Sequence, residues 1–171
     1  MKKLNPTYAE SSNYRGITQN TRRLSATAMD DLRNFVLERD HRKCAYCDFH
    51  GDRFQTVWFI DGDSDNNKKT NLTTVCPMCN LILNTRVGCQ IEGIVELYEA
   101  SDYNQNKIVQ MTRKLRIEGK NDDEIRKRLG LKTKVPFRLN KEYLSALFAF
   151  VTSWKGSYGE CAEALAYGYS R

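Results

Sequence analysis

The sequence predicts a small α+β fold in which a two-stranded hairpin and a helix surround two cysteine pairs, with one helix before them and a helical C-terminal half after them. Two observations lead to this fold class. The cysteines form two C-x2-C pairs, Cys44 with Cys47 and Cys76 with Cys79, and 28 residues separate the pairs. The hydrophobic pattern is helical before the first pair, strand-like between the pairs and helical again beyond residue 88.

The chain divides into three parts, with no clear linker between them. Residues 1–24 are rich in Asn, Ser, Thr and Tyr and have no periodicity, which predicts an irregular N-terminal arm. Residues 25–100 contain both cysteine pairs and are expected to form one compact module. Residues 101–171 are expected to form a helical region packed on that module. A chain of 171 residues is long enough to bury one modest core.

A first helix is expected from about residue 25 to residue 40. Four apolar residues fall there at helical spacing: Met29, Leu32, Phe35 and Val36. Ser25 or Thr27 is available as the N-cap. Asp30 and Asp31 are expected in the first turn, where the helix dipole favours negative charge.

The segment between the cysteine pairs predicts a strand and a polar loop. Residues 54–60 are rich in aromatic and β-branched side chains, as strands are. Residues 61–71, DGDSDNNKKTN, are expected to form turns. Residues 72–84, LTTVCPMCNLILN, then predict a short strand or turn that leads into a helix.

Three further helical stretches are expected beyond Gly88. The first has one apolar face with four residues: Ile91, Ile94, Val95 and Tyr98. The second ends at Gly119 and carries a similar face: Ile108, Met111, Leu115 and Ile117. Asn121 and Glu124 then have the spacing of a capping box, which predicts the start of a short helix over Ile125 to Leu129.

A last helix is expected from Lys141 to about Lys155, after Pro136 has interrupted the pattern. Its apolar stripe is wide and contains six residues: Tyr143, Leu144, Leu147, Phe148, Val151 and Trp154.

The four paired cysteines predict one structural zinc site. Two residues between the cysteines of a pair let both sulfurs face one ion, and two such knuckles complete a tetrahedral shell. Buried free thiols or disulfides are the alternative, but residues 1–13 have no apolar stretch that could act as a signal peptide, and we expect a cytoplasmic, reducing compartment. Four thiolates leave no open position for water, so this zinc is expected to hold the fold without taking part in chemistry.

The two other cysteines and a group of three aspartates are not expected to bind metal. Cys89 and Cys161 are expected to be isolated core cysteines. Asp61, Asp63 and Asp65 resemble the start of a calcium loop, but Asn66 stands where that loop needs glycine and Leu72 where it needs glutamate. We therefore interpret the three aspartates as turn residues.

The net charge of +6 is unevenly distributed along the chain. Residues 1–43 carry a net +4, residues 44–100 a net −4 and residues 101–171 a net +6. A zinc ion with four thiolates would make the middle segment more negative by two units. The cysteine module is therefore a poor cradle for a nucleic-acid phosphate, and any such contact is expected from the basic flanks. No apolar run is long enough to insert into a membrane.

The block from Cys44 to Asn80 resembles the HNH, or ββα-metal, endonuclease family in its four-cysteine form. In this resemblance Asn71 matches the structural asparagine of the loop and Asn80 the third, metal-binding position. The paired catalytic positions fall on Trp58 and Phe59. An active member would have a metal-binding Asp or His at the first and a general-base His at the second.

Neither aromatic residue can perform that chemistry. Indole has no basic lone pair and phenyl has no polar atom, whereas proton abstraction needs a base within hydrogen-bond reach. The chain has two histidines, His41 and His50, and neither stands at the position of the base. The sequence therefore predicts a nuclease-like frame without catalysis, although rescue by His50 is left open.

The chain also resembles the IcmJ/DotN family of type IVB (Dot/Icm) secretion systems, which is similar to an HNH nuclease without the catalytic histidines. The resemblance lies in the first knuckle, in the loop, in the second knuckle and in residues 119–129, GKNDDEIRKRL. Before the second knuckle, the residues that carry the resemblance are Arg39, Asp40, Cys44, Cys47, Phe49, Asp61, Gly62, Asp63, Asn66, Asn67, Asn71 and Leu72. It implies a structural zinc and an adaptor role in a coupling complex, with a protein partner.

Two functional hypotheses remain. In the first, the chain is a binding module in which Trp58 and Phe59 either anchor a protein partner or simply fill the former catalytic cleft. In the second, it is a nucleic-acid-binding protein or divergent endonuclease of phage or mobile-element type, with a helix-turn-helix over residues 108–134. Its candidate contacts are Arg126, Lys127, Arg128, Lys132 and Lys134. A packed helical hairpin with a solvated basic face explains the same residues.

Overall fold

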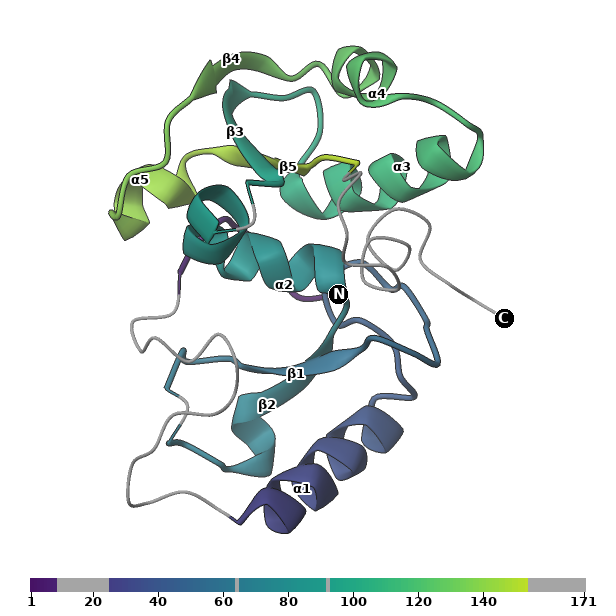
Figure 1. Ribbon diagram of the computed structural model, residues 1–171, viewed down its shortest axis with the longest axis vertical. Coiled ribbons are helices and arrows are strands. Elements are labelled where there is room, and N and C mark those ends of the chain that lie inside the picture. Colours follow the sequence, from purple (N-terminus) through teal and green to yellow (C-terminus); the bar gives the residue numbers. More distant parts are fainter. Residues whose placement is uncertain (9–24, 64, 92, 154–171) are drawn as a thin grey trace.

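The structure is a computed structural model that describes residues 1–8, 25–63, 65–91 and 93–153, and it shows a mixed α+β fold (Figure 1). The helical elements are α1 (Ala26–Arg39), η1 (Lys69–Asn71), α2 (Pro77–Leu83), η2 (Val87–Ile91), α3 (Gln105–Ile117), α4 (Asp122–Arg128) and α5 (Lys141–Ser145). The strands are β1 (Thr56–Phe59), β2 (Leu72–Val75), β3 (Val95–Ala100), β4 (Lys132–Val135) and β5 (Phe148–Val151). No helix in these ranges is long and apolar enough to cross a membrane.

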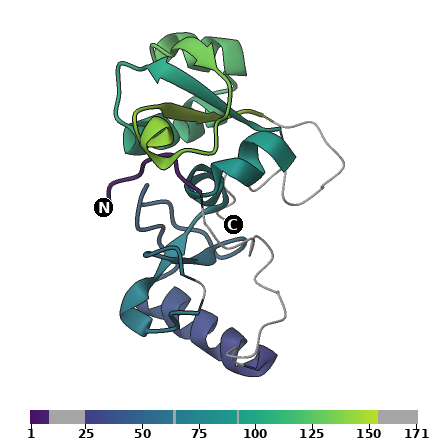
Figure 2. The same cartoon turned by 90° about the vertical axis from the view of Figure 1, so that its left-hand side faces the viewer.

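The strands form two small antiparallel sheets. β1 and β2 pair as a hairpin with Trp58 opposite Thr73 and Phe59 opposite Leu72. β3 is the central strand of the second sheet, whose order is β4-β3-β5. α1 covers the hairpin, α3 packs on the second sheet, and α2 lies between the two halves of the molecule (Figures 1 and 2).

The first helix confirms the expected boundaries but not the expected position of its acidic residues. Ser25 is the N-cap, and its Oγ accepts a hydrogen bond of 3.2 Å from the backbone N–H of Ala28. Asp30 and Asp31 were expected in the first turn, and this is wrong, because α1 begins at Ala26 and its first turn contains no acidic residue. The signal from Ser25 was the stronger one, since a side-chain cap fixes the first helical residue.

The expected helix beyond Gly88 is wrong. Only the short π-helical turn η2 forms there, and Val95 to Ala100 is the strand β3. Val95, Leu97 and Tyr98 are all buried, so the strand has no clean alternation of apolar and polar residues. Hydrogen bonding of β3 to both β4 and β5 makes this segment a strand. Apolar residues are buried on both of its faces, and their spacing in the sequence only happens to match that of a helix.

The expected last helix is also wrong over most of its described length. α5 ends at Ser145, and β5 begins at Phe148 and pairs with β3. Leu144, Leu147 and Val151 are buried as the stripe requires, but the first belongs to a helix and the last to a strand. The C-terminal half is therefore not simply helical. Trp154 and Lys155 lie outside the described residues.

The middle of the C-terminal half follows the sequence closely. α3 ends before Gly119, whose φ of +79° is the left-handed conformation that ends helices. Asn121 and Glu124 form the complete capping box at the start of α4, with both reciprocal hydrogen bonds present. Met111 and Leu115 face the apolar cluster beside the sheet, but Ile117 is 67% exposed.

The described part of the N-terminal arm contains neither helix nor strand, yet it is packed on the fold. Leu4 is almost completely buried. The backbone N–H of Lys2 donates to the carbonyl of Ala45, and that of Thr7 donates to the carbonyl of Ile82. The arm therefore connects the first knuckle with α2. Residues 9–24 of the expected arm lie outside the described part of the chain.

Candidate metal centre

Two different local structures present the four cysteines. Cys44 and Cys47 lie in the loop between α1 and β1, where the backbone N–H of Cys44 donates to the carbonyl of Phe49 and closes the knuckle. Cys76 is the N-cap of α2, and Cys79 lies in the first turn of that helix. Pro77 at the start of α2 fixes the backbone between the second pair.

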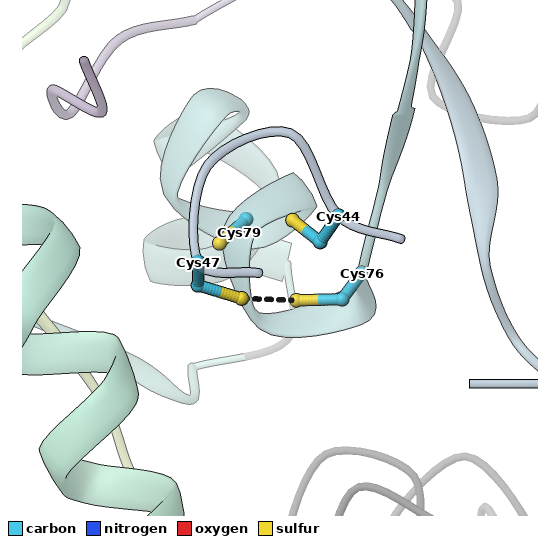
Figure 3. A group of neighbouring side chains, drawn as sticks. All are labelled: Cys44, Cys47, Cys76 and Cys79. Atoms are coloured by element: carbon cyan, nitrogen blue, oxygen red, sulfur yellow. Dashed lines mark hydrogen bonds between the residues drawn. The ribbon is translucent and has the colours of Figure 1, made fainter. Parts of the chain in front are cut away.

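The four sulfurs converge on one point (Figure 3). All lie within 4.8 Å of one another, and the Sγ atoms of Cys47 and Cys76 are 3.6 Å apart. A tetrahedral zinc with Zn–S bonds of about 2.3 Å places its sulfurs about 3.8 Å apart. The four side chains are buried, and none of them forms a disulfide. The donor set and its spacing therefore fit a single metal ion such as zinc.

The thiols of the cluster have perturbed acidities. Burial raises the pKa of Cys76 and Cys79 well above the ordinary value for a thiol. Hydrogen bonds from the other three cysteines lower the pKa of Cys44. Burial, together with the charge of Cys44, raises the pKa of the neighbouring Tyr46 to about 12. A bound metal ion would remove the difference among the cysteines, because metal ligation deprotonates a thiol outright.

The ion-pairing residues Arg39 and Asp40 fix the first knuckle against the hairpin. Arg39 pairs with Asp40 at 2.7 Å and donates to the backbone carbonyls of Lys69 and Leu72. The Asp40 carboxylate accepts a 2.8 Å hydrogen bond from the backbone N–H of Thr74. These contacts join the end of α1, a few residues before the first cysteine pair, to the β1–β2 hairpin.

Asn71 organises the loop between β1 and β2. Its Nδ2 donates to Asp61 Oδ1 at 2.8 Å and to the carbonyl of Asn66 at 2.9 Å. Its Oδ1 accepts from the backbone N–H of Asp61 at 3.1 Å. Asp61 and Asp63 each accept a hydrogen bond from the backbone N–H two residues later, which confirms their interpretation as turn residues.

Trp58 and Phe59 end β1 and are both half-buried. Trp58 packs against the main apolar core and lines an open groove of about 910 Å³, together with Tyr8, Tyr46 and Leu83. We call this the Trp58 groove. Its other wall residues include three lysines and three carboxylates: Lys2, Lys3, Lys141, Asp61, Asp63 and Glu142. Formal charge along the Trp58 groove is therefore balanced.

The remaining candidate residues are not part of the four-cysteine cluster. Asn80 is half-exposed on α2, and its side chain makes no hydrogen bond with the described residues. His50 is exposed and forms an isolated β-bridge with Lys43. Cys89 is half-buried, and burial raises its pKa to about 12. Cys161 lies outside the described residues.

Among the described residues, two of the five basic candidates at α4 and β4 form ion pairs, and three do not. Arg126 and Lys134 both bind the carboxylate of Glu96, at 2.9 and 2.7 Å. Three others are exposed and form no ion pair within the described ranges: Lys127, Arg128 and Lys132. α4 packs through Ile125 and Leu129, both completely buried.

Sequence reasoning missed three polar residues of α3 that contact the knuckles: Asn106, Gln110 and Arg113. Asn106 is 60 residues after its partner Tyr46 in the chain, and Gln110 is 63 residues after its partner Cys47. The signal that could have found them is their spacing, since residues 106, 110 and 113 share one face of a helix.

Comparison with known proteins gives one short similarity. The chain is 36% identical over 44 residues to the type 4 apparatus protein DotN of Legionella pneumophila. Part of this chain is similar to DotN. The similar segment is 26% of this chain and spans about a fifth, 21%, of DotN. No protein-family model matches the chain.

Proposed function

We propose that this protein is a non-catalytic adaptor of a type IV secretion apparatus, built on an HNH-like frame around one structural zinc. The observation that carries the proposal is the closed cluster of four buried cysteine sulfurs next to a strand that ends in Trp58 and Phe59. A four-thiolate site offers no position for water or substrate. The residues at the former catalytic positions provide neither a base nor a metal ligand.

Three features support the HNH-like part of this proposal. The chain order of β1, β2 and α2 is that of a ββα unit, and the second cysteine pair lies at the start of its helix. Asn71 holds the loop of the hairpin through its own side chain. The elements that would position a nuclease site are therefore present. The side chains at the two matched catalytic positions, Trp58 and Phe59, are aromatic.

The adaptor role is supported by the Trp58 groove and by the similarity to DotN, a protein named for a type 4 apparatus. Aromatic side chains in a concave surface are common anchors of protein interfaces. The equal numbers of cations and carboxylates along the groove favour a polypeptide over a polyanion, since a nucleic-acid site shows excess positive charge where the backbone lies.

The test of catalysis is a nuclease assay on the zinc-loaded protein with added Mg²⁺ or Mn²⁺. We expect one zinc per chain and no cleavage of single-stranded or duplex DNA. Cleavage that His50→Ala abolishes would contradict the non-catalytic role and would show that His50 replaces the missing base. The His41→Ala variant is the matched control.

The test of the adaptor role is affinity capture from cells that contain a type IV secretion apparatus, followed by mass spectrometry. The wild type should recover apparatus proteins, and Trp58→Ala should lose them. Phe35→Ala is the control, because Phe35 is an aromatic residue with 42% exposure on α1, outside the Trp58 groove. Recovery of no apparatus protein, or equal recovery by Trp58→Ala, would contradict this role.

The same preparation should be tested for binding to duplex DNA across a salt series. We expect no specific complex at physiological salt, since Glu96 and Asp123 pair with Arg126 and Lys134 and together balance their charges. Salt-dependent binding that is lost in a Lys127→Ala, Arg128→Ala double variant would instead make the protein a nucleic-acid binder.

A further inference from the structure

The helix α3 contacts the cysteine cluster through one polar face. Asn106 Nδ2 donates to the carbonyl of Tyr46 at 2.6 Å, between the cysteines of the first knuckle. Gln110 Nε2 donates to the carbonyl of Cys47 at 3.2 Å. Arg113 Nη2 donates to the sulfur of Cys76 at 3.4 Å. Two of these contacts are to backbone, and the third is to a candidate metal ligand itself.

Arg113 is an unusual partner for a sulfur because its charge is buried. The residue is 8% exposed, and its guanidinium lies 3.7 Å from the centroid of the Phe49 ring. Its Nη1 is buried and has no hydrogen-bond partner, and no carboxylate pairs with it within the described residues. A guanidinium is always protonated, so its positive charge must be balanced by something nearby.

The cysteine cluster offers that charge the strongest counter-charge when a metal ion is bound. Four neutral thiols carry no charge, and a thiol sulfur is a weak acceptor. Four thiolates around one divalent ion carry a net charge of about −2. A hydrogen bond from a cation to a thiolate is charge-assisted and correspondingly stronger. The ring of Phe49 adds cation–π attraction but supplies no net negative charge.

We propose that Arg113 is the charge-balancing partner of the metal-loaded cluster. Its guanidinium donates to the thiolate of Cys76, and this contact couples metal retention to the packing of α3 on the knuckles. This inference rests on the metal-binding part of the proposed function. It assigns a positioning role to a residue from the C-terminal half, which the cysteine spacing cannot reveal.

The first test compares the rates at which full-length, zinc-loaded variants release zinc to excess EDTA. Arg113→Met keeps the length of the stem and removes the charge, and we expect release about 10-fold to 100-fold faster, as for other residues that support metal ligands. Arg113→Lys keeps a charge without the planar fork and should fall between Arg113→Met and the wild type. Lys114→Met, on the exposed neighbour, should match the wild type.

Arg116→Lys provides a second control, because Arg116 is buried on the same helix but pairs with Asp122. If Arg113→Met does not fold, faster release from Arg113→Lys than from Arg116→Lys supports the proposal. Equal rates for Arg113→Met and wild type, or for the two lysine variants where only these fold, would overturn it.

Thermal melting separates charge balance from simple packing. In the zinc-free, reduced protein the cluster offers Arg113 less negative charge, so Arg113→Met should lower the melting temperature little or not at all. In the zinc-loaded protein the same variant should melt lower. A residue that only fills space would lower both temperatures equally, and that result would overturn the proposal. Where zinc-free chains show no transition, the release rates decide.

Zinc binding and the role of Arg113 can be contradicted separately. If no zinc co-purifies with the wild type and none can be loaded, the metal site of the proposed function is wrong and this inference falls with it. If zinc binds with one ion per chain but its release does not depend on Arg113, only the inference is wrong.

Discussion

The cysteine cluster and the Asp122 region each receive one buried arginine from α3, and they balance its charge by different means. Arg116 pairs with the Asp122 carboxylate at 2.9 Å and donates to the carbonyl of Val151. Arg113, three residues earlier, has a sulfur and an aromatic ring around it. The charge of Arg116 is balanced by a carboxylate of the polypeptide itself. The balance at Arg113 depends on the negative charge of the cysteine cluster, which is largest when a metal ion holds all four sulfurs as thiolates, so only this second region should respond to metal removal.

The largest expected effect is the loss of the metal ligands. Structural zinc contributes roughly 10 to 16 kcal/mol in small zinc peptides, as much as the whole free energy of unfolding of a typical domain. We expect Cys76→Ser to abolish zinc binding and to weaken the cooperative unfolding transition strongly, as followed by zinc analysis and circular dichroism. Cys89→Ser is the matched control and should keep both. Loss of zinc in Cys89→Ser would contradict the assignment of the ligands.

The next largest effect concerns the ion pair between Arg116 and Asp122. Asp122→Asn leaves Arg116 buried without its counter-charge, and we expect the free energy of unfolding to fall by about 2 to 4 kcal/mol, with zinc release unchanged. The Asp122 side chain keeps 16% exposure, which places the effect in the lower part of the range for buried pairs. Asp123→Asn, on a residue 91% exposed, is the control. A change in zinc release caused by Asp122→Asn would break the separation between the two regions.

The Asp122 effect should also depend on pH. Burial alone raises the pKa of this carboxyl, but the hydrogen bonds from the Ser153 backbone and from Arg116 outweigh it and lower the pKa below the ordinary value. A lowered pKa stabilises the fold above about pH 4, and that stability is lost as the pH falls through the folded-state pKa. Denaturant melts of wild type and Asp122→Asn should therefore converge in acid. A gap that stays constant down to pH 2 would contradict this account.

The smallest effect distinguishes the two asparagines of the HNH-like frame. Asn71→Ala removes three hydrogen bonds that close the hairpin loop, and we expect a loss of about 1 to 3 kcal/mol in the free energy of unfolding. Asn80→Ala should change it by less than about 0.5 kcal/mol, because its half-exposed side chain lacks such contacts within the described residues. Equal losses in chemical denaturation would show that Asn71 does not hold the loop.

The elements that the sequence predicts well are those whose signals are local. The two C-x2-C pairs, the cap at Ser25 and the capping box at Asn121 each act within a few residues, and the structure confirms all of them. The α+β class follows from these signals together with the strand-like pattern of residues 54–60. HNH-like membership and the adaptor role stay proposals.

The second sheet could not be predicted in the same way. β3 and β5 have apolar residues at helical spacing, and only their mutual pairing makes them strands. The same is true of the contacts to the cluster, because Arg113 reaches Cys76 across 37 residues of sequence. Pairing between distant segments overrides local preference, and a single sequence carries no direct sign of it.

The central claim is that the four cysteines form one closed metal site, and the most direct test is the ratio of zinc to protein in the purified, reduced chain. The account predicts one zinc per chain for the wild type and for Cys89→Ser, and none for Cys44→Ser or Cys76→Ser. A metal-free wild type that binds no added zinc, or one whose four cysteines are joined in disulfides, would contradict it.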